Sequence, residues 1–286
     1  MNLSAESANR DYQTNLKQHL KLSSEQQMNL EIFAVAHREP DVKVPDGISL
    51  IGTSGFQACL TDNTGVHISN KNPRWSELTA IYWLLKNHNL QASHVGICHY
   101  RRYLASYSLT ENMRRHSGGL PFGMIKPADF GSLRDHLSSN KILQLMKKLR
   151  ADILVPEPYV SAMSVRDAFR HYHKSAASDF DLTFQIAVKK SYLSESFVNW
   201  FLARREMHPC NMAVLPTDLF IQIWTAMFDI LFELEPRVLE KENDYQNRTF
   251  AFIAERLFSA LLFWRINQTR SCPIARVCSI VMVDAS

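Results

Sequence analysis

Four short apolar runs, each stopped by polar side chains or by proline, constrain the fold of this chain more than any other feature. They cover residues 30–36, 48–51, 94–98 and 151–155. Each run is shorter than an ordinary helix and has the composition of a buried strand. Segments with apolar residues at helical spacing separate them, for example at 73–87, where Asn72 is predicted as the capping residue. This alternation predicts an α/β fold with a mainly parallel sheet flanked by helices.

The second half of the chain has a mostly helical pattern from about residue 164. Helices are expected at 164–173, 179–192, 194–206, 217–234 and 248–268. One further strand is expected at 210–215, a closing edge strand at 277–283, and an irregular loop at 105–129. Residues 1–27 are polar and poor in large apolar side chains, which predicts a variable appendage outside the core. We therefore expect one domain over 28–286 with a helix-rich C-terminal part.

Composition excludes several classes of protein. The net charge is +4, from 32 basic and 28 acidic residues, which is too balanced to indicate nucleic-acid binding. The 5 cysteines are odd in number and include no Cys-x-x-Cys pair, so neither a disulfide framework nor a zinc site is indicated. The N-terminus has no apolar signal-peptide core, and no run reaches the ~18 apolar residues of a membrane span. We expect a cytoplasmic protein.

Polar residues that directly follow the apolar runs are the first candidates for a site, because ligands of open α/β sheets bind beyond the carboxyl ends of the strands. His37 follows the first run, and His99, Tyr100, Arg101 and Arg102 follow the third. Two adjacent guanidinium groups at a strand end can clamp a diphosphate through bidentate hydrogen bonds. Ion pairs with carboxylates distant in sequence explain the arginines equally well at this point.

Several segments of the chain carry a resemblance to a known family. They read SELTAIYW at 76–83, KN at 86–87, VGICHYRRY at 95–103, ISNKN at 68–72, ADILVP at 151–156, FDIL at 228–231 and AERL at 254–257, with Asn211-Met212 before an apolar run. The chain resembles the capsular-polysaccharide glycosyltransferases marked by the His-Tyr-Arg-Arg-Tyr motif, a domain of unknown function. It departs from their pattern at Asn211-Met212-Ala213-Val214, where a phenylalanine is usual, so the choice of substrate can differ.

The resemblance implies a transferase that uses a nucleotide-diphosphate sugar and has a GT-A-like, Rossmann-like fold. Some relatives are linked to galactofuranosyl transfer. Donor binding is then expected at the five polar residues named above and at Asp62 and Asn70, although turns favour Asp and Asn for local reasons as well.

Transfer with inversion requires a base for the acceptor hydroxyl. Asp152, His208 and Glu255 are the candidates, and structural roles stay open for each. Asn211 and Arg256 are assigned to acceptor binding. Glu255-Arg256 lies on an otherwise apolar helix face, where a buried charge pair is costly without a use.

A divalent metal is disfavoured as a cofactor. Many GT-A enzymes bind Mg²⁺ or Mn²⁺ through an Asp-x-Asp motif after a central strand, and this chain has His-Tyr-Arg-Arg there. Its literal Asp-x-Asp, Asp179-Phe180-Asp181, falls at an expected helix start, where acidic residues favour the helix dipole. Arginine side chains can neutralise a diphosphate in place of the metal.

Two hypotheses follow from the sequence. In the first, a glycosyltransferase acts on a lipid- or polymer-linked glycan acceptor, with peripheral contact at the inner face of the membrane. In the second, a non-catalytic module binds nucleotides or phosphorylated glycans through Arg101 and Arg102. Turnover of a nucleotide sugar distinguishes them.

Overall fold

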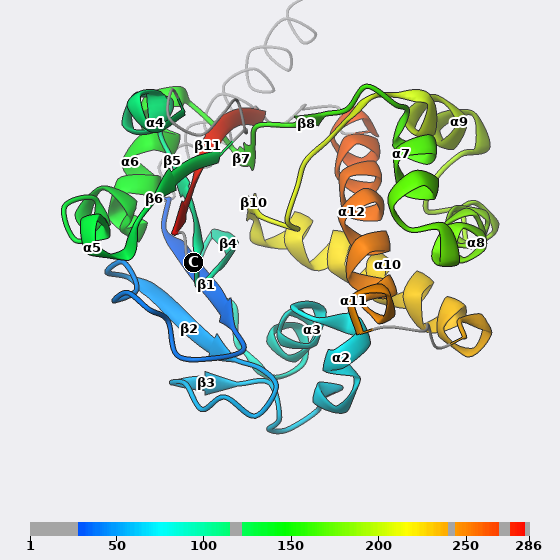
Figure 1. Cartoon of the computed structure of the whole chain (residues 1–286), viewed down its shortest axis with the longest axis horizontal. Coiled ribbons are helices and arrows are strands. Elements are labelled where there is room, and N and C mark those ends of the chain that lie inside the picture. The colour runs from blue at the N-terminus through cyan, green and yellow to red at the C-terminus, as the bar shows by residue number, and fades with distance from the viewer. Residues whose placement is uncertain (1–27, 115–121, 240–243, 269–274, 284–286) are drawn as a thin grey trace, which may run out of the picture.

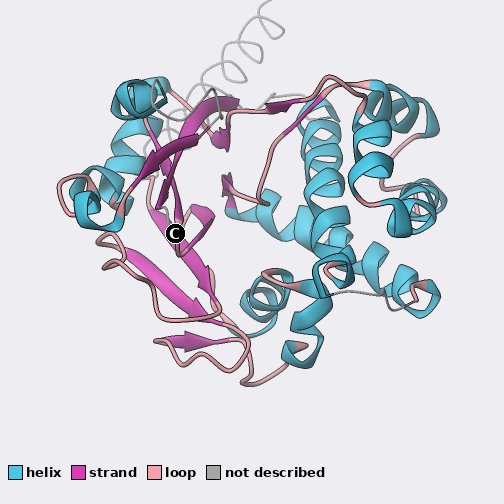
Figure 2. Ribbon diagram, viewed as in Figure 1, coloured by secondary structure: helices cyan, strands magenta, loops and turns pink. Residues whose placement is uncertain are grey.

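The computed structural model describes residues 28–114, 122–239, 244–268 and 275–283. The predicted appendage, 1–27, lies outside these residues. Figure 1 shows a half built on strands, with helices α4, α5 and α6 on its outer side, facing a half built on α7–α10 and α12. Figure 2 shows the same division by secondary structure. The predicted α/β class and the helix-rich C-terminal part are confirmed.

The strands have the following bounds: β1 Leu30–Ala36, β2 Ile48–Gly52, β3 Leu60–Thr61, β4 His94–His99, β5 Arg102–Ala105, β6 Phe122–Ile125, β7 Ile153–Pro156, β8 Tyr159–Val160, β9 Glu206–Met207, β10 Ala213–Pro216 and β11 Ala275–Val283. The α-helices are α2 Asn72–Trp75, α3 Leu78–Asn87, α4 Tyr107–Arg114, α5 Pro127–Phe130, α6 Ser139–Leu149, α7 Val165–Tyr172, α8 Ala177–Lys189, α9 Glu195–Ala203, α10 Thr217–Leu234, α11 Asp244–Asn247 and α12 Thr249–Gln268.

The main sheet is mixed, and part of it closes on itself. Strands β3, β2, β1 and β4 are adjacent and parallel, which is the arrangement that the sequence predicts. Beyond β4 the sheet turns into a ring of five strands, because β4 pairs with both β5 and β10, and β11 and β7 join those two. Four pairings in this ring are antiparallel, so the prediction of a mainly parallel sheet holds for the first half only.

One prediction for a strand and one for a loop are wrong. The C-terminal strand β11 is not an edge, because it pairs with β5, β6 and β7. Residues 105–129 are not one irregular loop: helix α4, strand β6 and the start of α5 lie within them, and 115–121 fall outside the described residues. Periodicity is weak in such short elements, which pairing with β11 and helix packing stabilise.

The helical half is built around a large aromatic core. Trp75 and Trp224 are buried, and Trp75 stacks on Phe250 with ring centroids 4.7 Å apart. Trp224 stacks on Phe258 at 5.2 Å. Both tryptophans therefore pack in the core.

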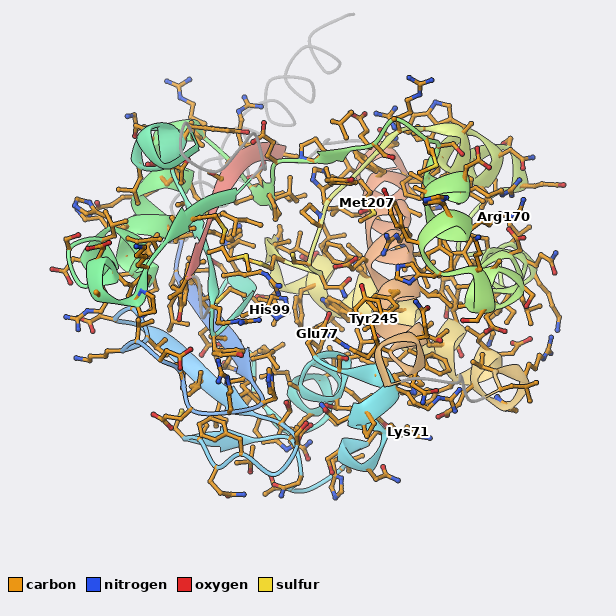
Figure 3. The ribbon with its side chains drawn as sticks, in the orientation of Figure 1. Lys71, Glu77, His99, Arg170, Met207 and Tyr245 are labelled. Carbon is orange, nitrogen blue, oxygen red and sulfur yellow. The ribbon has the colours of Figure 1, made fainter. Side chains whose placement is uncertain are left out.

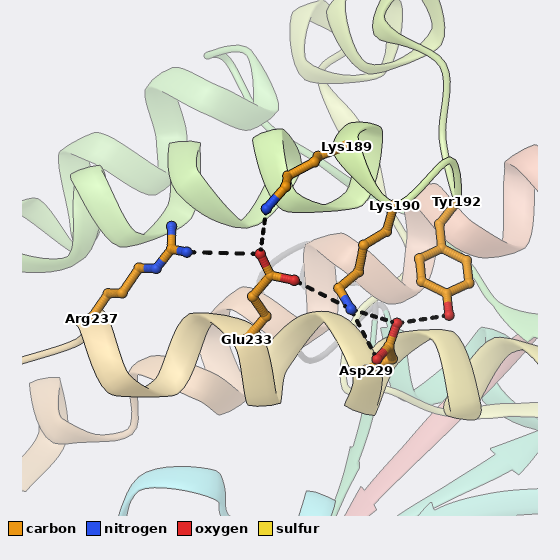
Figure 4. Close-up of polar contacts among 6 residues, drawn as sticks. All are labelled: Lys189, Lys190, Tyr192, Asp229, Glu233 and Arg237. Carbon is orange, nitrogen blue, oxygen red and sulfur yellow. Dashed lines mark hydrogen bonds and ion pairs between the residues drawn. The ribbon is translucent and has the colours of Figure 1, made fainter.

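Ionic contacts on the surface join α8 to α10, as Figure 4 shows. Lys190 Nζ lies 3.0 Å from Asp229 Oδ2 and 3.2 Å from Glu233 Oε2, and Lys189 Nζ lies 3.2 Å from Glu233 Oε1. Tyr192 donates to Asp229 Oδ2 at 2.9 Å. These side chains remain partly exposed to solvent, with exposed fractions from 24 % for Glu233 to 74 % for Lys189, so each contact stabilises the protein only slightly.

The helix predicted at 73–87 is interrupted. Ser76 takes a left-handed conformation, with φ 48°, between α2 and α3. Asn72 lies inside α2 rather than at its cap, and its Nδ2 donates to the Ser76 carbonyl oxygen at 3.0 Å. The interruption brings Glu77 to the surface of a pocket.

Candidate functional site

A pocket of about 1000 Å³ lies at the carboxyl ends of β1, β2 and β4. Its lining includes Val35 near the end of β1 and His37 after it, Thr53 after β2, and the segment 99–102, which begins at the last residue of β4. Strand β1 lies between β2, to which the chain continues on one side, and β4 on the other side. Open α/β sheets bind ligands at such switch points. Residues of α2, α11 and α12 form the opposite wall, so the pocket separates the two halves of the molecule.

The turn between β4 and β5 presents the His-Tyr-Arg-Arg motif to this pocket. His99 pairs with Arg102 across the turn, which leaves Tyr100 and Arg101 at its tip. Tyr100 is buried, accepts a hydrogen bond from Arg38 Nε at 3.3 Å, and has the Arg101 guanidinium 5.3 Å from its ring centroid. Tyr100 therefore supports two arginines.

Arg101 and Arg102 form no ion pair with any carboxylate of the described residues. Arg248, which precedes α12, also lines the pocket and donates from Nε to Ser76 Oγ at 3.0 Å. The alternative explanation, that distant carboxylates neutralise the motif's arginines, thus has no support among these residues. The pocket thus offers the guanidinium groups of Arg101, Arg102 and Arg248 to a ligand.

The Cys210–Asn211 turn connects several pocket residues. Both residues are left-handed, with φ 68° and 53°, although neither is glycine. The Cys210 carbonyl lies 2.7 Å from His99 Nε2, and the Cys210 amide donates to Glu255 Oε1 at 3.0 Å. Asn211 Nδ2 donates to Glu77 Oε1 at 2.9 Å. One strained turn thereby holds an imidazole and two carboxylates.

The helical wall carries aromatic rings as well as charge. Arg256 Nη1 lies 2.9 Å from Glu255 Oε2, which confirms the predicted pair. Phe252 stacks on His173 at 4.1 Å, and Tyr245 lies 5.0 Å from Phe252. Tyr245 is 58 % exposed. Figure 3 shows Tyr245 across the pocket from His99, with Glu77 between them.

Burial and the arginines shift the pKa values of the pocket. Burial lowers the pKa of His99 to about 4, and Arg102 acts in the same direction, so the ring is neutral at pH 7. Because a carbonyl only accepts, Nε2 carries the proton and Nδ1 is an acceptor. Burial raises the pKa of Glu77, against the hydrogen bond from Asn211 and the charges of Arg248 and Arg102. Burial also raises the pKa of the Cys210 thiol to about 12, which keeps it neutral.

Comparison with known proteins identifies the family. The model of the domain of unknown function DUF4422 matches residues 31–266, which is most of the chain. The chain belongs to the DUF4422 family. No curated protein matches it. Among solved structures, the apo form of WbbM, a bifunctional glycosyltransferase, is similar with a TM-score of 0.77 and 24 % sequence identity. The match covers 90 % of this chain and 45 % of WbbM, so this chain spans less than half of that protein.

The pocket of this DUF4422 protein gathers most of the residues predicted from the sequence. Those that line it are His37, Asn70, His99, Tyr100, Arg101, Arg102, Glu255 and Arg256. Asn211 is 1 % exposed and does not line the pocket. It contacts Glu77, which does line the pocket. The motif was thus a good guide to the location of the pocket.

Three predicted residues lie elsewhere. Asp62 is buried, with its Oδ2 2.5 Å from Thr79 Oγ1. His208 is buried, with Nδ1 2.7 Å from the Pro156 carbonyl oxygen. Asp152 precedes β7 and interacts with His94, at the first residue of β4 and the opposite end of that strand from the motif. None of the three lines the pocket.

Sequence reasoning missed Glu77, Arg248 and Tyr245. Glu77 lies within the SELTAIYW segment, so the resemblance marked its neighbourhood but not its role. Arg248 and Tyr245 lie next to the N-terminus of α12, and nothing in their local pattern distinguishes them from surface residues. Only the folded chain brings them opposite the β4–β5 turn.

Among the described residues, no three His, Cys, Asp or Glu side chains are grouped as a metal site requires. Asp179 and Asp181 lie near the start of α8, as predicted, and Asp181 pairs with Arg170 at 2.5 Å. Neither residue lines the pocket.

In the described part of the chain, no helix combines the length and the apolar character needed to cross a membrane.

Proposed function

We propose that this protein is a glycosyltransferase that moves a sugar from a nucleoside-diphosphate donor to a glycan acceptor. The observation that carries the proposal is the set of three guanidinium groups, on Arg101, Arg102 and Arg248, without carboxylate partners among the described residues. They line a pocket at the carboxyl ends of parallel strands, where nucleotides bind in α/β folds. Charge-assisted hydrogen bonds from guanidinium suit a diphosphate.

The size and the second wall of the pocket support a two-substrate reaction. A volume of about 1000 Å³ is at the upper end of ligand pockets, which leaves room for a nucleotide sugar and part of an acceptor. When the bond between the sugar and the diphosphate breaks, negative charge develops on the leaving group, and the guanidinium groups stabilise it there. The carboxylates of Glu77 and Glu255 line the same pocket, and a carboxylate can take the proton of the acceptor hydroxyl.

The comparisons support the same proposal. The chain shares its fold with WbbM, which is described as a bifunctional glycosyltransferase. The two carboxylates favour catalysis over the alternative of a non-catalytic nucleotide-binding module. We extend the proposal to a surface-polysaccharide or lipid-linked acceptor, a galactofuranosyl donor, and action in the cytoplasm at the inner face of the membrane, on the basis of the sequence resemblance. Arginine then substitutes for a metal at the diphosphate.

The test is a panel of nucleotide sugars, including UDP-galactofuranose and UDP-galactopyranose, assayed for nucleoside-diphosphate release with and without EDTA. Arg102→Ala is compared with Lys147→Ala, which removes an exposed cation on α6 outside the pocket. Because Arg102→Ala removes a charge-assisted hydrogen bond, we expect its UDP affinity to fall 10- to 100-fold, which is about 1.5–3 kcal/mol of binding free energy. Lys147→Ala should keep the wild-type affinity. Release that is insensitive to EDTA is expected.

Two results would contradict the proposal. UDP binding without release from any donor, in the presence of acceptor glycosides, would favour the binding module. Equal UDP affinity of Arg102→Ala and the wild type would place the diphosphate away from the motif. Loss of release in EDTA would overturn the substitution of arginine for metal while leaving the transferase assignment intact.

A further inference from the structure

The Cys210–Asn211 turn is costly to form and has no role in the sheet itself. Two successive non-glycine residues with positive φ are unfavourable, although asparagine tolerates this conformation better than most. The turn precedes β10, and its polar groups contact His99, Glu255 and Glu77. Strain of this kind persists where the surrounding structure requires it, which is often at a functional site.

The contacts distinguish the two pocket carboxylates. Glu255 has both oxygens occupied, Oε1 by the Cys210 amide at 3.0 Å and Oε2 by Arg256 at 2.9 Å. Both oxygens of Glu255 are therefore engaged within the protein. Glu77 accepts a side-chain hydrogen bond from Asn211 at Oε1 and interacts with its own backbone amide, and no described side chain donates to Oε2. Glu77 therefore has an oxygen available to a substrate.

We propose that Glu77 is the base that takes the proton of the acceptor hydroxyl, and that the Cys210–Asn211 turn positions it. This inference rests on the proposed function. As the acceptor oxygen bonds to the anomeric carbon, its proton passes to Glu77 Oε2. The bond from the anomeric carbon to the donor phosphate breaks, and the nucleoside diphosphate leaves with its electron pair against the arginines. Asn211 fixes the carboxylate through Oε1 and acts as a positioning residue.

The groups around Glu77 agree with this role. Arg102 on β5 and Arg248 before α12 stabilise its ionised form, and the pocket lining also includes Cys210 and Glu255. His99 is neutral, and its Nδ1 accepts no hydrogen bond from the described residues. Burial raises the pKa of Glu77, which increases its affinity for a proton.

The experiment compares rates and pH profiles of nucleoside-diphosphate release with the donor selected in the panel. Glu77→Gln is expected to lower turnover at least 100-fold, the range of a general base, without weakening UDP binding. Asn211→Gly preserves the positive φ and removes only the side-chain donor. That donor stabilises the ionised form of Glu77. Its loss should therefore shift the acid limb of the pH–rate profile to a pH about one unit higher, and the rate should recover above that pH. Asn211→Asp is expected to move it further.

The control is Ser191→Gly, which replaces another left-handed residue, φ 62°, in the exposed connection between α8 and α9. It should leave the profile unchanged. A Glu77→Gln variant with wild-type turnover, or an Asn211→Gly variant with an unshifted limb, would overturn the inference. Carboxyl ¹³C NMR titration of Glu77 in the wild type and Asn211→Gly tests the positioning contact without a donor. Absence of turnover in the wild type contradicts the proposed function instead, so the two failures are distinguishable.

Discussion

Replacing Gly96 by alanine tests the ring of strands directly. Gly96 lies in the middle of β4, opposite Ile32 of β1 and Val214 of β10. A Cβ atom at this position would lie 3.0 Å from Ile32 Cγ1 and 3.1 Å from Val214 Cγ2. Both neighbours are buried, so they have little space to move. The close approach exists only because β4 has a neighbour on each side.

The expected cost follows from these distances. Ordinary contacts between such atoms are about 3.5–4.0 Å, so both neighbours must shift by several tenths of an ångström. Overpacking of this kind costs about 1–3 kcal/mol, and the smaller unfolded-state entropy of alanine returns about 0.4–1 kcal/mol. We expect Gly96→Ala to lower the free energy of unfolding by about 1–2 kcal/mol. For a chain of this size, Tm then falls by about 2–3 °C.

Urea unfolding followed by circular dichroism measures this change. Gly131→Ala is the matched control, because φ is −54° there and no atom lies within 4 Å of the added Cβ. It should leave stability unchanged or slightly higher. Val214→Ala removes one of the clashing methyl groups, so the cost of Gly96→Ala should be smaller in that background. A Gly96→Ala protein as stable as the wild type, or fully additive costs in the double variant, would refute the packing of β4 between β1 and β10.

Two further predictions concern residues outside the pocket. His208→Ala should destabilise the fold by about 1–3 kcal/mol in urea unfolding, because it leaves the buried Pro156 carbonyl without its partner, while UDP affinity by calorimetry stays at the wild-type value. A large loss of UDP affinity in this variant would instead indicate that His208 contributes to the binding site. Lys189 and Lys190 lower the pKa of Glu233, so its contribution to stability is present at neutral pH and disappears as the pH falls through that lowered pKa. Melting temperatures of the wild type and Glu233→Gln should therefore differ slightly at pH 7 and converge in acid; a constant difference would contradict the ion pairs.

Local chemistry made much of this fold predictable from the sequence. The first strand was expected at 30–36 and is found at Leu30–Ala36, because a β-branched apolar run of that length has few alternatives. The long helices α10 and α12 were predicted for the same kind of reason, from apolar residues at helical spacing. The position of the His-Tyr-Arg-Arg motif after a buried strand was sufficient to predict one wall of the pocket.

Only the tertiary structure decided the other wall and the closure of the sheet. Strand β11 pairs with β5, which lies about 170 residues earlier, and no local pattern encodes a pairing over that separation. Arg248 and Glu77 reach the pocket in the same way, from segments whose sequences predict ordinary helices. The break at Ser76 costs backbone strain that local propensity would avoid, and the packing of α2 and α3 around it offsets that cost. The sequence by itself thus determined the elements and the motif, whereas long-range packing determined which charges meet.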